Sequence, residues 1–394
     1  MKKSMICIAV ASILSVPVYA TDEAQDTSNQ VSNIAQAFSE GDAHVALRYR
    51  YENVDQANFA DTADLSAVRF RLNFQTKSVS DFSAFFEADH LAQVWDTDYN
   101  SKLNGNTAFP VIADPMYTEM NQAYISYTGI KNTTVKYGRQ RINLDNQRFV
   151  GGVGWRQNEQ TYDGVTIVNT GIKDTTVVFA SLYNVNNILG GNLSKGQHNI
   201  LNVTYKGLGI GAITGYGYLL ENISDTYGIR LKGSQKVSKM DLGYELEYAT
   251  QETDNTASIS TDYYLLEASL GNKSFTGKVG YEVHTAKNGV SFQTPLGTNH
   301  KFNGWADKFL AIQGDGMEDT YFGAIIPFSG MKLSAFYHDF AAENSSRNFG
   351  TEFDIALSKK FNKTYGLLLK YASYSAKDFS SDTDKLWIQF TANF

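Results

Sequence analysis

Residues 44–52, His-Val-Ala-Leu-Arg-Tyr-Arg-Tyr-Glu, alternate between apolar and polar side chains with a period of two. Successive side chains of an extended strand point to opposite faces, so one face would be apolar and the other would carry charge. Arg69 and Arg71 repeat the pattern on the next predicted strand. A transmembrane barrel wall, with lipid outside and a wet, charged interior, has this pattern. A soluble sandwich would instead pack its aromatic face against a second sheet.

The composition favours strands and argues against several classes of protein. The chain holds 24 Tyr, 24 Phe and 32 Gly but only 5 Pro, which favours strands over helices. No run of about 18 apolar residues occurs after the first twenty residues, which argues against transmembrane helices. The net charge of -7 argues against a nucleic-acid-binding protein, so no nucleic-acid partner is expected.

Residues 1–20 have the features of a secretory signal peptide: two lysines, an apolar run and a small residue at the end. The only cysteine, Cys7, lies in this segment, which excludes disulfides and cysteine ligands from the exported chain. Residues 21–43 are expected to form a periplasmic segment. One prediction is a short helix that acts as a plug or a chaperone contact at the barrel mouth. The other is a frayed leader to the first strand. Residues 44–394 would form the barrel.

Eighteen segments of alternating character follow, each about the length of a tilted membrane strand of ~9 to 11 residues. They are residues 44–53, 66–77, 82–94, 119–128, 133–143, 160–168, 175–185, 198–206, 209–220, 226–236, 240–250, 262–271, 274–285, 318–328, 331–341, 350–360, 364–375 and 384–394. Short turns rich in Gly, Asn, Ser or Lys alternate with longer polar connections. The sequence therefore predicts one all-β, antiparallel transmembrane barrel of eighteen strands, with sixteen as the second choice, short periplasmic turns and long extracellular loops.

The last predicted strand ends at Phe394 after an apolar alternation. An aromatic carboxy-terminal residue on such a strand resembles the signal that the outer-membrane insertion machinery reads. The expected location is the bacterial outer membrane. The expected partners are this machinery, membrane lipid and lipopolysaccharide, and the oligomeric state stays open.

Arginines are concentrated in residues 138–160. Strict alternation would point Arg139 and Arg141 toward lipid, where an arginine near the midplane costs ~2 to 4 kcal/mol. A bulge or twist near Gly138 is therefore predicted to turn both side chains inward. The glycine-rich connection that follows is expected to fold over or into the lumen.

The same segment carries a family resemblance. The run Gly-Arg-Gln-Arg (138–141) through Asp-Asn-Gln-Arg-Phe-Val-Gly (145–151) to Gly-Trp-Arg-Gln-Asn-Glu-Gln-Thr-Tyr-Asp-Gly (154–164) resembles the signature segment of alginate-export-type outer-membrane porins. Residues 38–55 resemble the first strand of that family. The resemblance implies an eighteen-stranded barrel with an arginine-lined passage for anionic sugar polymers or smaller anions. Polymer export, uptake of oligosaccharides and general diffusion all stay open.

The predicted function is passive diffusion of anionic solutes, either acidic oligosaccharides or organic acids, through an arginine-lined constriction. Rings of Arg or Lys in a pore favour anions, and guanidinium groups pair bidentately with carboxylates. The predicted basic lining residues are Arg48, Arg50, Arg69, Arg71, Arg139, Arg141, Arg148, Arg156, Arg230 and Lys278. The predicted acidic lining residues, on a facing wall, are Glu87, Asp89, Glu245, Glu247 and Glu282. In the alternative interpretation these charges form ion pairs that only keep the lumen polar.

Two functions of other classes stay open. An outer-membrane barrel enzyme, such as a phospholipase, would need a nucleophile and a base, and Ser334 with His338 is the candidate pair. The second rival is an adhesin or receptor with a closed lumen. The six histidines show no metal-ligand spacing, and the sequence predicts no catalytic residue, metal or cofactor.

Changing Arg69 and Arg71 together to Ser is expected to lower the selectivity of the channel for anions over cations, because two positive charges leave the predicted constriction. The reversal potential across a planar bilayer in a salt gradient measures this selectivity. An unchanged reversal potential would count against a role for the two arginines.

Overall fold

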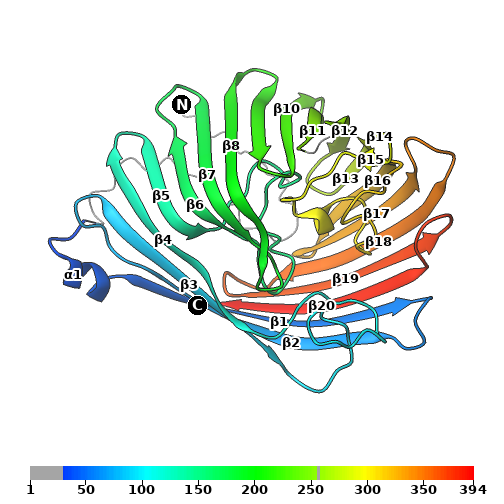
Figure 1. Cartoon of the computed structure of the whole chain (residues 1–394), viewed down its shortest axis with the longest axis horizontal. Helices are drawn as coiled ribbons and strands as arrows, with labels where there is room; N and C mark the ends of the chain where they lie inside the picture. The colour runs from blue at the N-terminus through cyan, green and yellow to red at the C-terminus, as the bar shows by residue number, and fades with distance from the viewer. Residues whose placement is uncertain (1–29, 255–257) are drawn as a thin grey trace.

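The alternating segments pair into one closed antiparallel sheet in the computed structural model, which describes residues 30–254 and 258–394. Within these residues, eighteen strands form the barrel wall, and β1 pairs with both β2 and β20 to close it. Figure 1 shows β1, in blue, beside β20, in red. The wall strands are β1 (Asp42–Gln56), β2 (Ala63–Gln75), β3 (Phe82–Gln93), β4 (Thr118–Ile130), β5 (Thr133–Gln140), β6 (Thr161–Asn169), β7 (Thr175–Asn186), β8 (Asn192–Leu208), β9 (Gly211–Leu220), β10 (Ser224–Val237), β11 (Met240–Thr253), β12 (Ser260–Gly271), β13 (Thr276–His284), β16 (Met317–Phe328), β17 (Met331–Ala341), β18 (Asn348–Lys360), β19 (Tyr365–Ala376) and β20 (Thr383–Asn393).

The predicted barrel of eighteen strands is therefore confirmed, and each predicted segment overlaps one wall strand. One difference that bears on the site concerns the segment 133–143, because β5 ends at Gln140 and the chain then leaves the wall. The predicted signal peptide, residues 1–20, lies outside the described residues. In the part of the chain that the structure describes, no helix combines the length and the apolar character needed to cross a membrane.

The two faces of the wall differ as the alternation predicts. On β2, Phe70 and Leu72 are 46% and 54% exposed, while Arg69 and Arg71 between and beside them are 7% and 9% exposed. The exposed apolar side chains form the outer surface that lipid would cover, and closure of β1 on β20 leaves the sheet without an edge strand. Charge is held on the inner face.

Three long connections at one end of the barrel bury side chains against its inner face, although residues 102–105 of the first one are exposed. They are residues 94–117, 141–160 and 285–316, the last of which contains β14 (Ala286–Lys287), β15 (Val290–Ser291) and the short 3-10 helix η2 (Asn299–Lys301). Figure 1 shows the connection after β5 and the one after β13 inside the ring of strands. At the other end the connections are short turns, such as the one between β16 and β17.

Each inward connection buries apolar side chains against its own sector of the wall. Residues 94–117 contribute Tyr99 and Ile112 to a cluster with β1 to β3. Phe149 of the 141–160 connection packs among Tyr216, Tyr263 and Phe292. A third cluster joins residues 306–312 to β17, β18, β19 and β20, and includes the fully buried Trp387. Apolar burial of this kind fixes the connections inside the barrel mouth.

A short helix, α1 (Ile34–Ser39), precedes the wall, and the Asn33 side chain caps its N-terminus. Its Phe38 ring stacks on Phe74, which shares the outward side of β2 with Leu72. Ile34 and Phe38 are exposed beside the outward-facing Phe82. A helix was expected in residues 21–43, but α1 packs on the outer rim, which does not fit the suggestion that this part plugs the barrel mouth.

Candidate functional site

The connection 141–160 is held against the wall by arginines of β1 and β2. Arg48 donates from Nε to the Gln157 side chain at 2.7 Å and from Nη1 to the Gly154 carbonyl at 2.9 Å, and it also donates to the Arg156 carbonyl. Arg69 donates to the Gln157 carbonyl at 3.1 Å. These two wall arginines therefore satisfy main-chain acceptors of a connection that has no regular structure of its own.

Glu159 is the central carboxylate of this arrangement. Its side chain lies 3.6 Å from Arg69 and 3.2 Å from Arg71, and it also accepts a hydrogen bond from Arg141. Burial alone would raise the pKa of the Glu159 carboxyl, but the guanidinium groups of Arg141, Arg71 and Arg69 outweigh burial and hold that pKa well below its usual range. Glu159 therefore stays ionised, and it neutralises arginines that would otherwise be buried without a counter-charge.

A second layer of carboxylates comes from β3. Arg71 binds Asp89 with two hydrogen bonds, of which the one from Nε measures 2.7 Å. Arg141 donates to Glu87 at 2.7 Å, and Asn121 and Gln122 donate to the same carboxylate oxygen. Both carboxylates lie on the strand next to the arginines. The expectation that these two acidic residues face the arginines across the lumen is therefore wrong, because strand pairing brings them together side by side.

Arg156 joins the connection 141–160 to the connection 285–316. Its guanidinium lies 2.6 Å from Asp307 and 3.4 Å from Glu52, and Lys385 of β20 contacts Asp307 at 2.7 Å. The His300 imidazole donates from Nδ1 to the Asp307 carboxylate at 2.5 Å. Burial lowers the pKa of the His300 imidazole well below its usual value despite the nearby Asp307, so the ring is neutral at physiological pH.

Lys370 of β19 occupies an aromatic cage. Its ammonium lies 4.1 Å from the ring centroids of Trp155 and Trp305 and 5.0 Å from that of Trp387. Arg50 lies over the same Trp155 ring, also at 4.1 Å. Trp155 and Trp305 come from two different inward connections, so cation–π contacts fix both of them to one side of the wall.

The arginines of the other wall sector also carry local ion pairs. Arg148 pairs with Glu282 at 2.7 Å and donates to Asn303 at 2.7 Å. Arg230 pairs with Glu245 at 2.6 Å and lies 3.7 Å from Glu247. Glu245 and Glu247 lie on β11, next to Arg230 on β10, and Glu282 binds an arginine of an inward connection. The predicted separation into one basic and one acidic wall is thus wrong for these residues as well.

Arg139 lies apart from the other predicted residues. Gly138 has a φ of +129, which an L side chain rarely adopts, yet the β4 and β5 register places Arg139 opposite Ala123 and on the same side as Tyr137, which is 59% exposed. Arg139 pairs with Asp163, with an Nε to Oδ1 distance of 2.9 Å. The prediction that both arginines turn inward is confirmed for Arg141 and wrong for Arg139. Arg141 turns in because the wall strand ends one residue before it.

In several pairs the cation is the more exposed partner. The Lys232 side chain is 60% exposed and its partner Glu245 is 7% exposed. Arg141 is 18% exposed, against 4% for Glu87 and 6% for Glu159. Lys278, which was predicted as a lining residue, pairs with Glu267 at 2.7 Å, and the two are exposed about equally. Water inside this part of the barrel therefore meets ammonium and guanidinium groups before it meets their carboxylates.

Sequence reasoning missed several residues of the site. Lys232 lies two residues after Arg230 on the same predicted strand, so the alternation already placed its ammonium group on the inner face. Lys370 of β19 has the same signal, because it alternates with the exposed Leu369. Glu159, Lys301 and Asp307 carry no such signal, because the path of an irregular connection through the lumen is not encoded in a period of two. These residues join the site only through the folding of the connections 141–160 and 285–316.

The candidate catalytic residues Ser334 and His338 both lie on β17. His338 is bound by Asp319 through Nδ1 at 3.0 Å, and its Nε2 lies 3.8 Å from Asp354. Among the described residues no hydrogen bond joins it to Ser334, which lies two inward positions away on β17. In residues 30–254 and 258–394 no group of three His, Cys, Asp or Glu residues could hold a metal ion.

Comparison with known proteins agrees with this description. Residues 42–176 match the protein-family model described as Alginate export. No curated protein matches the chain. Residues 42–176 include the whole of the arginine-rich segment on which the sequence resemblance was based, and the resemblance is thereby confirmed.

Several solved structures share the fold. One is Pseudomonas aeruginosa OccK11 (OpdR), with a TM-score of 0.71, 14% identity, and coverage of 91% of this chain and 97% of that chain. Another is P. aeruginosa OpdK with vanillate, with a TM-score of 0.73, 15% identity, and coverage of 91% and 99%. Acinetobacter baumannii OccAB4 has a TM-score of 0.71, 16% identity, and coverage of 90% and 98%. The shared fold, the apolar outer surface and the closed wall place the chain in the bacterial outer membrane, as predicted.

Replacing Arg48 by Ala is expected to loosen the connection 141–160, because three donors to that connection are lost and hydrogen bonds from charged groups contribute about 1.5 to 3 kcal/mol each. The single-channel current in a planar bilayer should rise and fluctuate more. Lys173→Ala, on the short turn between β6 and β7 at the other rim, is the control and should keep the current of the unchanged protein. A current of unchanged size and noise for Arg48→Ala would show that Arg48 does not hold the connection.

Proposed function

We propose that this outer-membrane barrel, whose residues 42–176 match the alginate-export family model, is a passive channel for small organic anions. The observation that carries the proposal is that, in several pairs, the cations inside the barrel are more exposed than the carboxylates with which they pair. Lys232 and Arg141 are the exposed members of their ion pairs, while Glu245, Glu87 and Glu159 are covered. An anion entering the lumen would meet positive groups first, and a cation would find few accessible carboxylates.

The inward connections support selection by size as well as by charge. Connections 94–117, 141–160 and 285–316 each pack on the inner wall and are tied to one another by Arg156 and Asp307. Many of the predicted lining arginines are used for this anchoring and are nearly covered, as for Arg50 and Arg148, each 1% exposed. We assign these two a structural role, and we assign contact with the solute to the exposed cations.

A carboxylate is the favoured solute group. Guanidinium and ammonium groups both bind carboxylates, and the partner carboxylates already present show that the lumen cations have the required geometry. Vanillate, which appears with OpdK, is an aromatic carboxylate. An organic acid of that size is our first candidate for this chain, and an acidic oligosaccharide, in keeping with the family match, is the second.

Changing Lys232 and Lys278 together to Gln should lower the permeability of chloride relative to potassium, because the exposed cations would be removed while their carboxylate partners remain. The reversal potential in a salt gradient across a planar bilayer measures the ratio. The charge-matched control is Lys131→Gln with Lys173→Gln, since both residues are exposed on short turns at the other rim. Equal reversal potentials for the two double variants would contradict the proposal, and the absence of any ion current in the unchanged protein would favour a closed receptor.

Anion selectivity should also fall as the pH rises from 7 to 9.5. Burial, with the nearby Lys232, lowers the pKa of the Lys301 ammonium to about 8, and burial lowers the pKa of Lys308 to about 8. Each lysine is charged below its pKa and neutral above it, so positive charge leaves the lumen through this range. Lys301→Gln should give a smaller change in reversal potential across the same range. A pH-independent reversal potential in the unchanged protein would contradict the assignment of these lysines to the passage.

A further inference from the structure

The barrel wall is incomplete at one place near the end that carries the long connections. Pairing between β4 and β5 ends at Ala123 with Arg139, and pairing between β5 and β6 ends at Gln140 with Tyr162. Among the described residues, β4 continues beyond this level to Thr118 with no partner strand on the β5 side. The gap is crossed further along by one contact, in which the Tyr117 hydroxyl donates to the Ile188 carbonyl at 3.1 Å.

A cavity of about 640 Å³ lies at this gap. It is lined by residues from both faces of the wall: Glu119 lies opposite the inward-facing Asp89, while Thr118 lies opposite the exposed His90. Arg139, on the outward side of β5, lines the same cavity. A continuous hydrogen-bonded wall would separate residues of its inner face from residues of its outer face. The cavity contains both kinds, because the wall is interrupted where β4 runs past the end of β5, and it is therefore a lateral notch in the rim.

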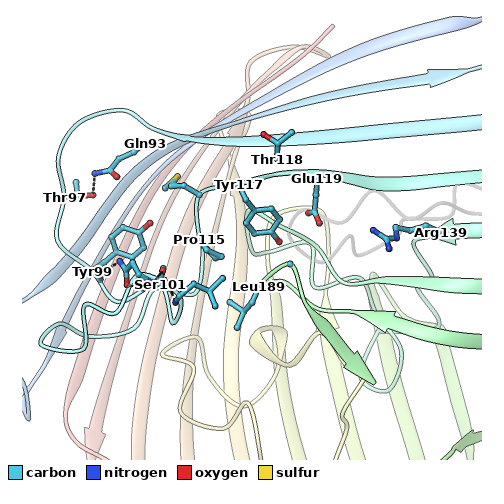
Figure 2. A pocket seen from close by; sticks show the side chains of 14 residues that line it. Gln93, Thr97, Tyr99, Ser101, Pro115, Tyr117, Thr118, Glu119, Arg139 and Leu189 are labelled. Carbon is cyan, nitrogen blue, oxygen red and sulfur yellow. Dashed lines mark hydrogen bonds between the residues drawn. The ribbon is translucent and has the colours of Figure 1, made fainter. Parts of the chain in front are cut away.

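The polar groups of the notch have unused hydrogen-bonding capacity. The Glu119 Oε1 atom is buried and has no hydrogen-bond partner in the protein. Arg139 binds Asp163 and the Met120 carbonyl, which leaves further N–H groups of its guanidinium for another acceptor. No ion pair within 4.0 Å joins Glu119 to Arg139 in the described residues, and Figure 2 shows both side chains bordering the same space.

The walls of the notch combine these groups with flat and apolar surfaces. Tyr99 and Tyr117 line it, together with Leu103 and Leu189. Figure 2 shows Tyr117 between Thr118 and Leu189. A volume of this size falls within the range of small-molecule sites, ~300 to 1,000 Å³, and the combination of apolar walls with few polar groups is typical of them.

The charges decide which ligand class fits. An anion would face the Glu119 carboxylate, and a cation would face the Arg139 guanidinium. Hydroxyl groups both donate and accept, so they can donate to the Glu119 oxygen and accept from the Arg139 guanidinium. The carbon face of a sugar ring can lie against tyrosine, whose ring is apolar on its faces and polar at its tip. We propose that the notch binds a neutral, hydroxyl-rich saccharide of one to a few rings, as a site separate from the proposed passage for anions.

Such a saccharide could come from two sources, the sugars of lipopolysaccharide in the surrounding leaflet or a free oligosaccharide outside the cell. Isothermal titration calorimetry of the purified full-length barrel in detergent would use two neutral probes, maltotriose and the uncharged hexose part of the core oligosaccharide released from lipopolysaccharide. We expect saturable binding of at least one probe. Binding of maltotriose alone would indicate a free-sugar site, and binding of the core hexose part alone would indicate recognition of lipopolysaccharide.

Two independent variants test the location. Glu119→Leu removes the unpaired carboxylate, and Leu189→Trp fills the notch from a surface loop without touching the wall strands. Each should weaken binding at least ten-fold, while Leu193→Trp, an exposed leucine outside the notch lining, should bind as the unchanged protein does. Binding of neither probe, or equal binding by both notch variants and the control, would overturn the proposal. Ion currents recorded with the same preparations test the proposed channel function separately.

Discussion

The interior of this barrel depends on the contact between the wall arginines and the connection 141–160. Guanidinium groups from β1 and β2 bind its main-chain carbonyls and its carboxylate Glu159, and the connection in turn neutralises and covers those groups. The wall arginines without the connection, or Glu159 without the arginines, would destabilise the protein, since a charge buried without its partner costs about 3 to 5 kcal/mol of stability. The irregular backbone and the arginine-rich wall are therefore a single unit, and the shape of the lumen follows from it.

This unit explains why the arginines differ in their accessibility. Arg48 and Arg50 are covered because they bind the connection, whereas Arg141 and Lys232 keep exposed surface because only their partners are covered. A lumen built in this way separates the groups that hold its shape from those available to a solute. Apolar packing of Phe149 and the cage around Lys370 then hold the connections 141–160 and 285–316 at fixed positions.

The sequence predicted the wall far better than the interior. A period of two defines the inward and outward faces of each strand, so the eighteen strands and the inward position of residues such as Arg48 and Arg230 could be read directly. The same rule pointed Arg139 toward the outside, where the structure places it. The expected inward turn at Gly138 was wrong for Arg139, because the chain leaves the wall only after Gln140 and so redirects Arg141 alone. Pairing between neighbouring strands depends on register, which placed Asp89 beside Arg71 instead of across the lumen. The roles of Glu159, Asp307 and Lys370 depend on how the irregular connections fold, and no local pattern encodes that.

The most direct test of this account compares single-channel conductance for the unchanged barrel and for a barrel in which residues 144–158 are replaced by a short Gly-Ser turn. If the connection narrows the lumen and covers the arginines, its removal should raise the conductance several-fold and shift the reversal potential further toward chloride, because Arg48 and Arg50 become exposed. Equal conductance and reversal potential in the two proteins would contradict the account.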